Sequence, residues 1–185
     1  MLIVFAGPSG VGKGSLVRRL LEQDARLWFS VSLNTRAPRP GEVHGVDYWF
    51  CDRAEFERLR DDGGLLEWFP VYDDLKGTPR APVEEHLAAG DDVVLELDVQ
   101  GARAVREVYP DALLVFVKPP SREVQRERLF ARDPGADPAV LERRIDRAEA
   151  EEREAADFDV VVVNDDLSRA ADEVAAILRA RRNPG

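Results

Sequence analysis

The sequence predicts a three-layer α/β fold, in which helices cover both faces of a parallel β-sheet. Four short apolar runs, at residues 2–6, 93–97, 113–117 and 160–163, are rich in Val, Leu, Ile and Phe and do not alternate with polar residues. Strands that are buried on both faces have this composition. Helical patterns separate the runs, and such strand–helix alternation is typical of α/β folds with right-handed crossovers.

Three helices are predicted from apolar residues that recur at spacings of three and four along the chain. They follow the first, second and last runs, and each is expected to lay its apolar face on the sheet. The residues that define them are Leu16, Val17, Leu20 and Leu21, then Ala102, Val105 and Val108, and finally Leu167, Ala171, Val174 and Leu178.

Length and composition limit the class of protein. A chain of 185 residues suits one α/β core with a small insertion or two, and 44% apolar residues can build a substantial core. The net charge of -10 disfavours nucleic acid and membrane surfaces as partners. The single cysteine, Cys51, allows no internal disulfide, and the first residues lack the basic leader of a signal peptide. We therefore expect a cytoplasmic protein with small-molecule ligands, as a monomer or a homodimer.

Two segments interrupt the alternation of strands and helices. Residues 31–90 mix β-forming residues with Pro and Gly turns, and they predict a small β-rich lobe with helices at 54–60 and 83–89, the second ending at Gly90. Residues 121–155 are rich in Arg and Glu, and Asp137-Pro138 is a typical helix start. This second segment predicts either a solvated helical hairpin or a mobile lid that carries arginines to a phosphate. The expected organisation is a core (1–30, 91–120, 156–185), a lobe (31–90) and a lid (121–155).

A glycine-rich loop lies between the first predicted strand and the first predicted helix. In this position it is a Walker A phosphate loop, which predicts a P-loop NTPase core that binds ATP. Its glycines let backbone N–H groups approach a phosphate, the helix N-terminus adds partial positive charge, and Lys13 adds a full charge. The expected ATP-binding residues of the loop are Gly7, Pro8, Ser9, Gly10, Val11, Gly12, Lys13, Gly14 and Ser15.

The loop departs from the usual motif at one position. Gly14 stands where Ser or Thr normally follows the lysine, and the first hydroxyl comes one residue later, at Ser15. Mg²⁺ is expected with the ATP, and its direct ligand is left open by this departure.

The segment after the first helix narrows the class of protein. Ser30-Val31-Ser32-Leu33-Asn34-Thr35-Arg36-Ala37-Pro38-Arg39-Pro40-Gly41-Glu42 is followed by Gly45-Val46-Asp47-Tyr48-Trp49-Phe50. This closely resembles the guanylate kinase pattern, and shorter matches such as Leu97-Asp98-Val99-Gln100-Gly101 continue in order along nearly the whole chain. The resemblance implies phosphorylation of GMP, and dGMP as well, by ATP in purine nucleotide metabolism.

The resemblance also implies roles for residues in the lobe and after the second strand. Arg36, Arg39 and Tyr48 would hold the GMP phosphate, since guanidinium forks suit phosphate oxygens. Glu67 would accept both adjacent donors of guanine, which adenine lacks. The companions implied for the GMP site are Ser32, Lys76, Gly77, Thr78, Glu96 and Asp98, and Asp98 would also hold water around Mg²⁺, with Ser15 as the second expected metal residue.

The lid and the last strand complete the implied site. Arg132 and Arg144 would close over the transferring phosphoryl group as catalytic residues, together with Lys13 and Arg36. Arg128 would support ATP, and Asn164 would line the adenine pocket. The remaining arginines of the lid are interpreted as solvated surface, namely Arg122, Arg126, Arg143, Arg147 and Arg153.

Two departures from the family pattern stand in the lobe and the lid. Lys76 replaces a tyrosine that helps to hold the phosphate, so the lysine either reaches the phosphate as a point charge or turns outward. Asp133-Pro134 replaces a glycine after Arg132, which would weaken the pull of that arginine and stiffen the loop.

Two other functions remain open at this point. One is a non-catalytic guanylate-kinase-like module that binds phosphorylated peptides, which the presence of Lys13, Asp98 and Arg132 disfavours. The other is a small-molecule kinase acting on a sugar phosphate, which would not need Glu67, Ser32 or the Arg36/Arg39/Tyr48 set.

Overall fold

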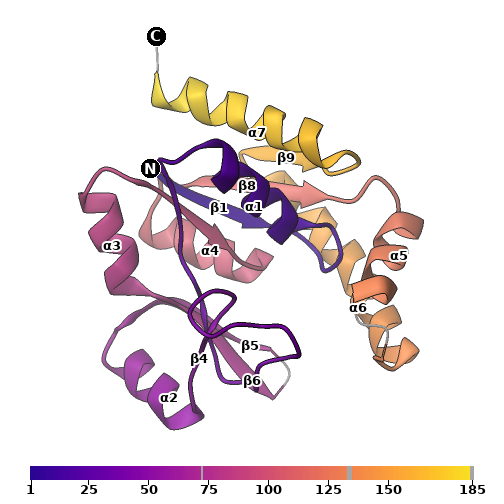
Figure 1. Ribbon diagram of the computed structural model, residues 1–185, viewed down its shortest axis with the longest axis horizontal. Coiled ribbons are helices and arrows are strands. Elements are labelled where there is room, and N and C mark those ends of the chain that lie inside the picture. Colours follow the sequence, from indigo (N-terminus) through magenta and orange to yellow (C-terminus); the bar gives the residue numbers. More distant parts are fainter. Residues whose placement is uncertain (72, 133–134, 184–185) are drawn as a thin grey trace. The chain divides into compact units, whose positions relative to one another are not determined.

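The computed structural model describes residues 1–71, 73–132 and 135–183 (Figure 1). The chain divides into two compact units. The first comprises Met1–Ile3, Arg26–Leu95 and Gln100–Ala112, and the second comprises Val4–Ala25, Glu96–Val99 and the chain from Leu113 onward. The expected division into core, lobe and lid stays a prediction.

A five-stranded sheet carries the α/β fold, with strand order β2-β7-β1-β8-β9. β2 pairs with β7, and β8 pairs with β9, in parallel. The bounds of the strands are β1 Leu2–Ala6, β2 Leu27–Phe29, β7 Asp92–Glu96, β8 Leu113–Lys118 and β9 Val160–Val163. The four strands predicted from apolar runs are therefore confirmed, and β2 is a fifth that the sequence did not reveal.

Burial along these strands follows their place in the sheet. All five residues of β1 are buried, as are the first five of β8. The prediction that every run is buried on both faces is wrong for β9, where Val161 and Val163 are 43% and 44% exposed. Val161 and Val163 point to the face opposite the buried Val162, and at the end of the strand order this face is left uncovered.

The helices form where the apolar spacing predicted them. They are α1 Lys13–Gln23, α4 Val99–Val108 and α7 Leu167–Arg182, and α1 packs against α7. The terminal members of two patterns are wrong as core residues, because Val108 ends α4 and Leu167 begins α7. At the helix ends these side chains stay 49% and 38% exposed.

The β-rich segment forms a four-stranded sheet of order β4-β3-β6-β5, with bounds β3 Leu33–Asn34, β4 Trp49–Phe50, β5 Leu65–Val71 and β6 Asp74–Pro79. Its small core consists of Leu33, Phe56, Leu65 and Leu75.

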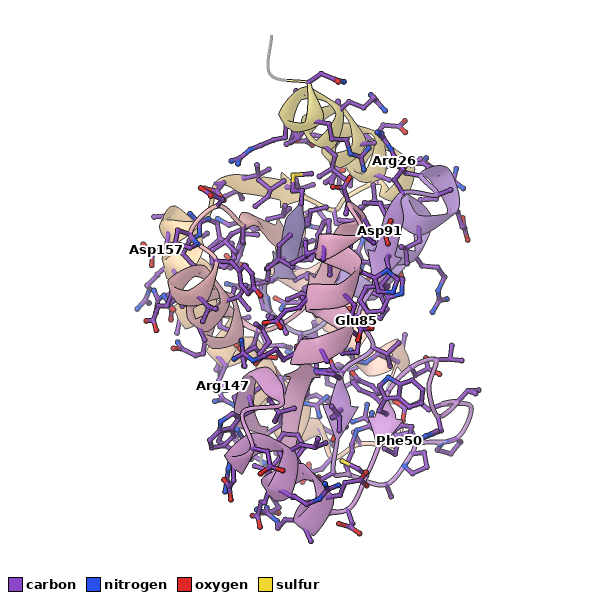
Figure 2. All side chains as sticks on the ribbon, turned by 90° about the vertical axis from the view of Figure 1, so that its left-hand side faces the viewer. Arg26, Phe50, Glu85, Asp91, Arg147 and Asp157 are labelled. Carbon is purple, nitrogen blue, oxygen red and sulfur yellow. The ribbon has the colours of Figure 1, made fainter. Side chains whose placement is uncertain are left out.

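The lobe helices are α2 Arg53–Asp61 and α3 Arg80–Ala88. Gly90 follows the C-cap of α3 with a φ of 90°, so the predicted stop is confirmed. Glu85 and Asp91 mark this end of α3 in Figure 2, and the Asp91 carboxylate lies 2.7 Å from His86 Nδ1.

The charged segment forms two helices that pack against each other, α5 Arg122–Arg132 and α6 Pro138–Arg153, followed by a short 3₁₀ turn at Glu154–Asp157 (Figure 1). The Asp137 carboxylate accepts the Ala139 N–H at 2.8 Å, which confirms the predicted helix start. The departure at Asp133-Pro134 lies outside the described residues. Within the described residues, no helix is both long and apolar enough to cross a membrane.

Candidate functional site

The glycine-rich loop connects β1 to α1 and contains three glycines in left-handed or related backbone conformations. Gly7, Gly10 and Gly12 have φ angles of 137°, 84° and 88°. These angles are unfavourable for residues with a Cβ, so the backbone path itself requires glycine.

Neighbouring elements also need these glycines to be small. A Cβ at Gly10 would lie 2.6 Å from Leu129 Cγ on α5, and one at Gly12 would lie 2.5 Å from Asn164 Nδ2. At Gly7 it would collide with the carbonyl oxygen of Val117 in β8. The loop is therefore packed tightly from behind.

Several carbonyl groups of the loop are held by side chains. Lys13 Nζ donates to the carbonyls of Gly7 at 2.5 Å and Pro8 at 3.0 Å. Asn164 Nδ2 donates to the Val11 carbonyl at 2.8 Å, and Asn164 is 3% exposed. These bonds fix the peptide planes of the loop.

α5 adds further donors to the same backbone. Arg128 Nη1 donates to the Val11 carbonyl at 3.3 Å and to the Asn164 carbonyl at 3.0 Å. Gln125 Nε2 donates to the Ser9 carbonyl at 2.7 Å. Because a trans peptide holds C=O and N–H on opposite sides, fixing the carbonyls also fixes the direction of the N–H groups that follow.

A cavity of about 720 Å³ opens in front of the loop, and all of its lining residues belong to the second unit. It brings together most of the residues expected around ATP and its transferring phosphoryl group, namely Pro8, Ser9, Gly10, Gly12, Lys13, Gly14, Ser15, Arg128, Arg132 and Asn164. Five further residues line it, namely Glu96, which was expected at the GMP site, and Arg18, Asp165, Asp166 and Leu167, which were not expected at any site.

Arg18 was missed although helical geometry could have identified it. It lies three and four residues after Ser15 and Gly14, so it shares their face of α1. Arg132 extends from α5, and its Nη2 donates to Ser9 Oγ at 3.3 Å. The cavity therefore gathers cationic side chains around the phosphate loop.

Glu96 explains the glycine that follows the lysine. It lines the cavity, and a Cβ at Gly14 would lie 3.3 Å from its Oε2. A serine or threonine at position 14 would have to share this space with the carboxylate. The Glu96 carboxylate and the Ser15 hydroxyl place oxygen atoms on the cavity wall that could bind a metal ion. Asp98 is not among the residues that line the cavity.

Three residues expected at this site do not line the cavity, namely Arg144, Gly7 and the fully buried Val11. Arg144 is half-buried on α6. About two turns further along α6, burial raises the pKa of the Glu151 carboxyl, and the charge of Asp98 raises it further while Lys13 and Arg147 lower it. This acid had no place in the sequence prediction.

In the first unit, Arg36 is bound by a carboxylate of its own chain. Its Nη1 and Nη2 each lie 2.6 Å from one oxygen of Glu42. This hydrogen-bonded pair raises the pKa of the Arg36 guanidinium and lowers the pKa of the Glu42 carboxyl. Glu42 Oε2 also accepts the backbone N–H of Arg39 at 2.7 Å.

A tight turn sets the position of Glu42. Pro40 and Gly41 are its central residues, Gly41 has a φ of 88°, and the Glu42 N–H donates to the Arg39 carbonyl at 3.0 Å. The role of Glu42 was missed, although the Pro-Gly pair that places it is visible in the sequence.

Two cations lie beside the ring of Tyr48. Arg36 Cζ is 5.0 Å from the ring centroid, and Lys76 Nζ is 5.6 Å from it. Arg36 Cζ also lies 5.5 Å from the ring centroid of Phe50, which is labelled in Figure 2. Lys76 Nζ lies 6.0 Å from the ring centroid of Phe69. These distances are within cation–π range, so the half-buried Lys76 shares the aromatic cluster of Arg36.

Glu67 and Thr78 form a buried polar pair across β5 and β6. They are 5% and 1% exposed, they are register partners, and Thr78 Oγ1 donates to Glu67 Oε1 at 2.6 Å. Gly77 is tightly enclosed, since a Cβ there would lie 3.0 Å from both the Glu67 carbonyl and Phe56 Cζ. Ser32 is buried in the same unit, and Arg39 is exposed.

The parallel sheet and the loop that precedes α1 define a P-loop α/β protein. The family model for guanylate kinase matches residues 1–181. The chain belongs to the guanylate kinase family.

Individual relatives agree with the family model. A guanylate kinase of Symbiobacterium thermophilum is 50% identical over 98% of this chain and 86% of its own length. One from a Mycobacterium species is 48% identical over the whole of this chain and 93% of its own length. A crystal structure of guanylate kinase from Anaplasma phagocytophilum superimposes with a TM-score of 0.81 at 34% identity, covering 98% of this chain and 85% of that one.

Proposed function

We propose that this protein transfers the γ-phosphoryl group of ATP to the phosphate of GMP, giving ADP and GDP, and that it accepts dGMP as well. The observation that supports this most directly is the presence of an intact phosphate loop with Lys13 in a chain of the guanylate kinase family. The same loop disfavours a non-catalytic module, since a module that only binds a partner does not need it.

In this proposal the cavity of the second unit holds ATP. Lys13 now bonds to the Gly7 and Pro8 carbonyls, and phosphate oxygens would compete for the same donors. Arg132, bonded to Ser9 Oγ, and Arg144 are the proposed lid cations. Arg128 and Asn164 have a double role, because they hold the loop backbone as well as line the cavity.

The acceptor site is proposed in the first unit. Arg36, Arg39 and Tyr48 would bind the dianionic phosphate, with Lys76 as an additional point charge. Glu67 would accept the adjacent N–H groups of guanine, with Thr78, Gly77 and Ser32 as its companions in this unit. Glu96 and Asp98, which the family resemblance also implies for GMP, belong to the second unit. An amino group in the place of guanine O6 and a missing 2-amino group would leave buried polar atoms unpaired, which strongly disfavours adenine.

The acceptor is already an anion, so the transfer needs no general base. Catalysis then consists of positioning and charge neutralisation by Lys13 and the arginines. Closure of the lid would exclude water and so limit hydrolysis of ATP.

The residues of the cavity fit a nucleotide-bound Mg²⁺. Within the described residues no group of three acidic, His or Cys side chains is arranged to hold a metal alone. Mg²⁺ is usually held by one or two protein oxygens, water and substrate phosphates, and the Ser15 hydroxyl and Glu96 carboxylate on the cavity wall supply such oxygens, with Asp98 as the residue proposed from the family. When bound, the ion neutralises charge on the phosphates.

The cytoplasm, where ATP and GMP are found, is the proposed compartment.

The test is a coupled assay with ATP and GMP, dGMP, AMP or UMP as acceptors. We expect turnover with GMP and dGMP and very little with AMP or UMP. Glu67→Gln, which keeps the shape but not the charge, is expected to reduce the preference for GMP over AMP by about a hundredfold, because discrimination based on buried polar groups is large. Equal turnover of GMP and AMP by the parent protein would overturn the proposal.

A further inference from the structure

α5 carries a polar side chain that the proposed reaction does not use. Gln125 is fully buried, with 0% of its surface exposed. Its Nε2 donates to the Ser9 carbonyl at 2.7 Å, and its Oε1 accepts from Arg122 Nη1 at 2.8 Å. A buried amide that is bonded at both ends cannot turn over without leaving polar groups unsatisfied.

The second of these bonds continues to the next helix. Arg122 Nη1 also lies 3.1 Å from Glu152 Oε1 on α6, and the two side chains are only 31% and 24% exposed. The interpretation of Arg122 as solvated surface is therefore wrong, because the side chain lies between two helices. A line of polar contacts runs from Glu152 through Arg122 and Gln125 to Ser9.

The Ser9–Gly10 peptide is a place where such an anchor matters. Gly10 has a φ of 84° and, as a glycine, loses little when its backbone rotates. Gln125 holds the carbonyl of this peptide from the α5 side, so the Gly10 N–H points the opposite way. Ser9 and Gly10 both line the cavity in front of the loop.

We propose that Gln125 is a positioning residue for the phosphate loop. It fixes the Ser9–Gly10 peptide so that the Gly10 N–H is directed at the nucleotide, and it connects that peptide through Arg122 to Glu152 on α6. Movement of α6 would thus reach the loop backbone through side chains. The inference rests on the proposal that this loop binds the phosphates of ATP.

The test compares Gln125→Met with the parent protein. Methionine has nearly the same volume and keeps the packing, but it cannot donate to the Ser9 carbonyl. We expect the Kd of ATP, measured by titration calorimetry without acceptor, to rise about tenfold, the effect of losing one backbone donor to phosphate. The KM for GMP should stay within about twofold, because that site is not touched. Gln23→Met, at an exposed glutamine of α1, is the matched control and should leave both values unchanged.

A second readout separates positioning from simple stability. Amide hydrogen exchange at Gly10 in the nucleotide-free protein should become faster in Gln125→Met, and it should change less in Arg122→Met, which keeps the Ser9 bond. If Gln125→Met does not fold, the double variant Arg122→Met/Gln125→Met replaces both side chains of the Arg122–Gln125 hydrogen bond by apolar groups. Its ATP affinity and its exchange at Gly10 are then compared with those of the parent protein.

The outcomes distinguish this inference from the proposed function. A folded Gln125→Met protein, or the double variant, with parental ATP affinity and parental exchange at Gly10 would overturn the positioning role. Lys13→Met addresses the function itself, because parental ATP binding in that variant would show that the loop does not hold the phosphates. Loss of ATP binding in Lys13→Met, together with no effect in Gln125→Met, would therefore contradict the positioning role of Gln125 and leave the proposed function standing.

Discussion

Arg36 and Glu42 form a bidentate ion pair, in which each guanidinium Nη lies 2.6 Å from its own carboxylate oxygen. The pair occupies one edge of the guanidinium, and Nη1 also donates to the Ala37 carbonyl at 3.0 Å. A planar guanidinium has a second edge, made of Nε and Nη2, that can face a ligand. A phosphate would thus meet an arginine whose orientation is already fixed.

Glu42→Gln should therefore weaken acceptor binding. A glutamine keeps one acceptor oxygen but places an NH₂ against the guanidinium, so Arg36 loses its bidentate, charged partner and its fixed orientation. We expect the KM for GMP to rise about tenfold with a smaller change in kcat, as for a loss of ground-state binding. Glu57→Gln, which breaks an exposed pair with Arg53, is the control. A lower KM for GMP would instead identify Glu42 as a competitor of the phosphate.

Lys76→Ala tests whether the lysine replaces the family tyrosine. Since its Nζ lies near Tyr48 and Phe69, we expect its loss to raise the KM for GMP more than the KM for ATP in steady-state kinetics. Arg60→Ala removes a comparable cation, 5.2 Å from the Trp68 ring, without touching the proposed site. Equal KM values for Lys76→Ala and the parent would assign Lys76 to the protein surface.

Lys13→Ala should fold normally and lose kcat by about three orders of magnitude or more, because a charge that stabilises the transferring phosphoryl group is removed. Thermal unfolding checks the fold, and the coupled assay checks turnover. Near-parental turnover would contradict the role given to this lysine.

Glu151→Gln should change the dependence of stability on pH. Burial raises the pKa of this carboxyl in the folded protein, so the folded state binds the proton more tightly than the unfolded state. The free energy of unfolding then falls as the pH rises from the ordinary pKa of a glutamate, which applies in the unfolded state, through the raised pKa of the folded state. We expect Glu151→Gln to melt at a higher temperature than the parent at neutral pH, and to lose this part of the slope.

The control for this variant is another glutamate of the same segment. A hydrogen bond from Ser121 lowers the pKa of Glu123, so its contribution has the opposite sign and is lost as pH falls. Glu123→Gln should therefore give no gain at neutral pH. A Glu151→Gln protein that melts below the parent at neutral pH would show that the carboxylate contributes a favourable interaction with Lys13 or Arg147.

The sequence predicted those features that depend on local pattern. β1 and β8 are continuous apolar runs with buried residues, and Asp137-Pro138 starts α6 through its own side chain. β2 escaped prediction because a strand of three residues is too short to show a period. The exposure of β9 depends on its place in the sheet, which no local pattern contains.

The candidate site shows the same limit. The glycine-rich loop is visible in the sequence because its spacing is local. The roles of Glu42 and Gln125 depend on side chains that meet after folding, and Gln125 contacts a residue 116 positions away. A buried glutamine within a charged helix looks like any surface residue until its neighbours are known.

The tight packing behind the phosphate loop changes how variants of its glycines should be interpreted. A side chain added at Gly10 would push on Leu129, and one at Gly12 would push on Asn164, whether or not a nucleotide is present. Loss of activity in such variants reports on the fit of the protein interior as much as on contact with ATP. Substitutions in this loop are thus restricted by packing against the protein interior as well as by contact with the nucleotide.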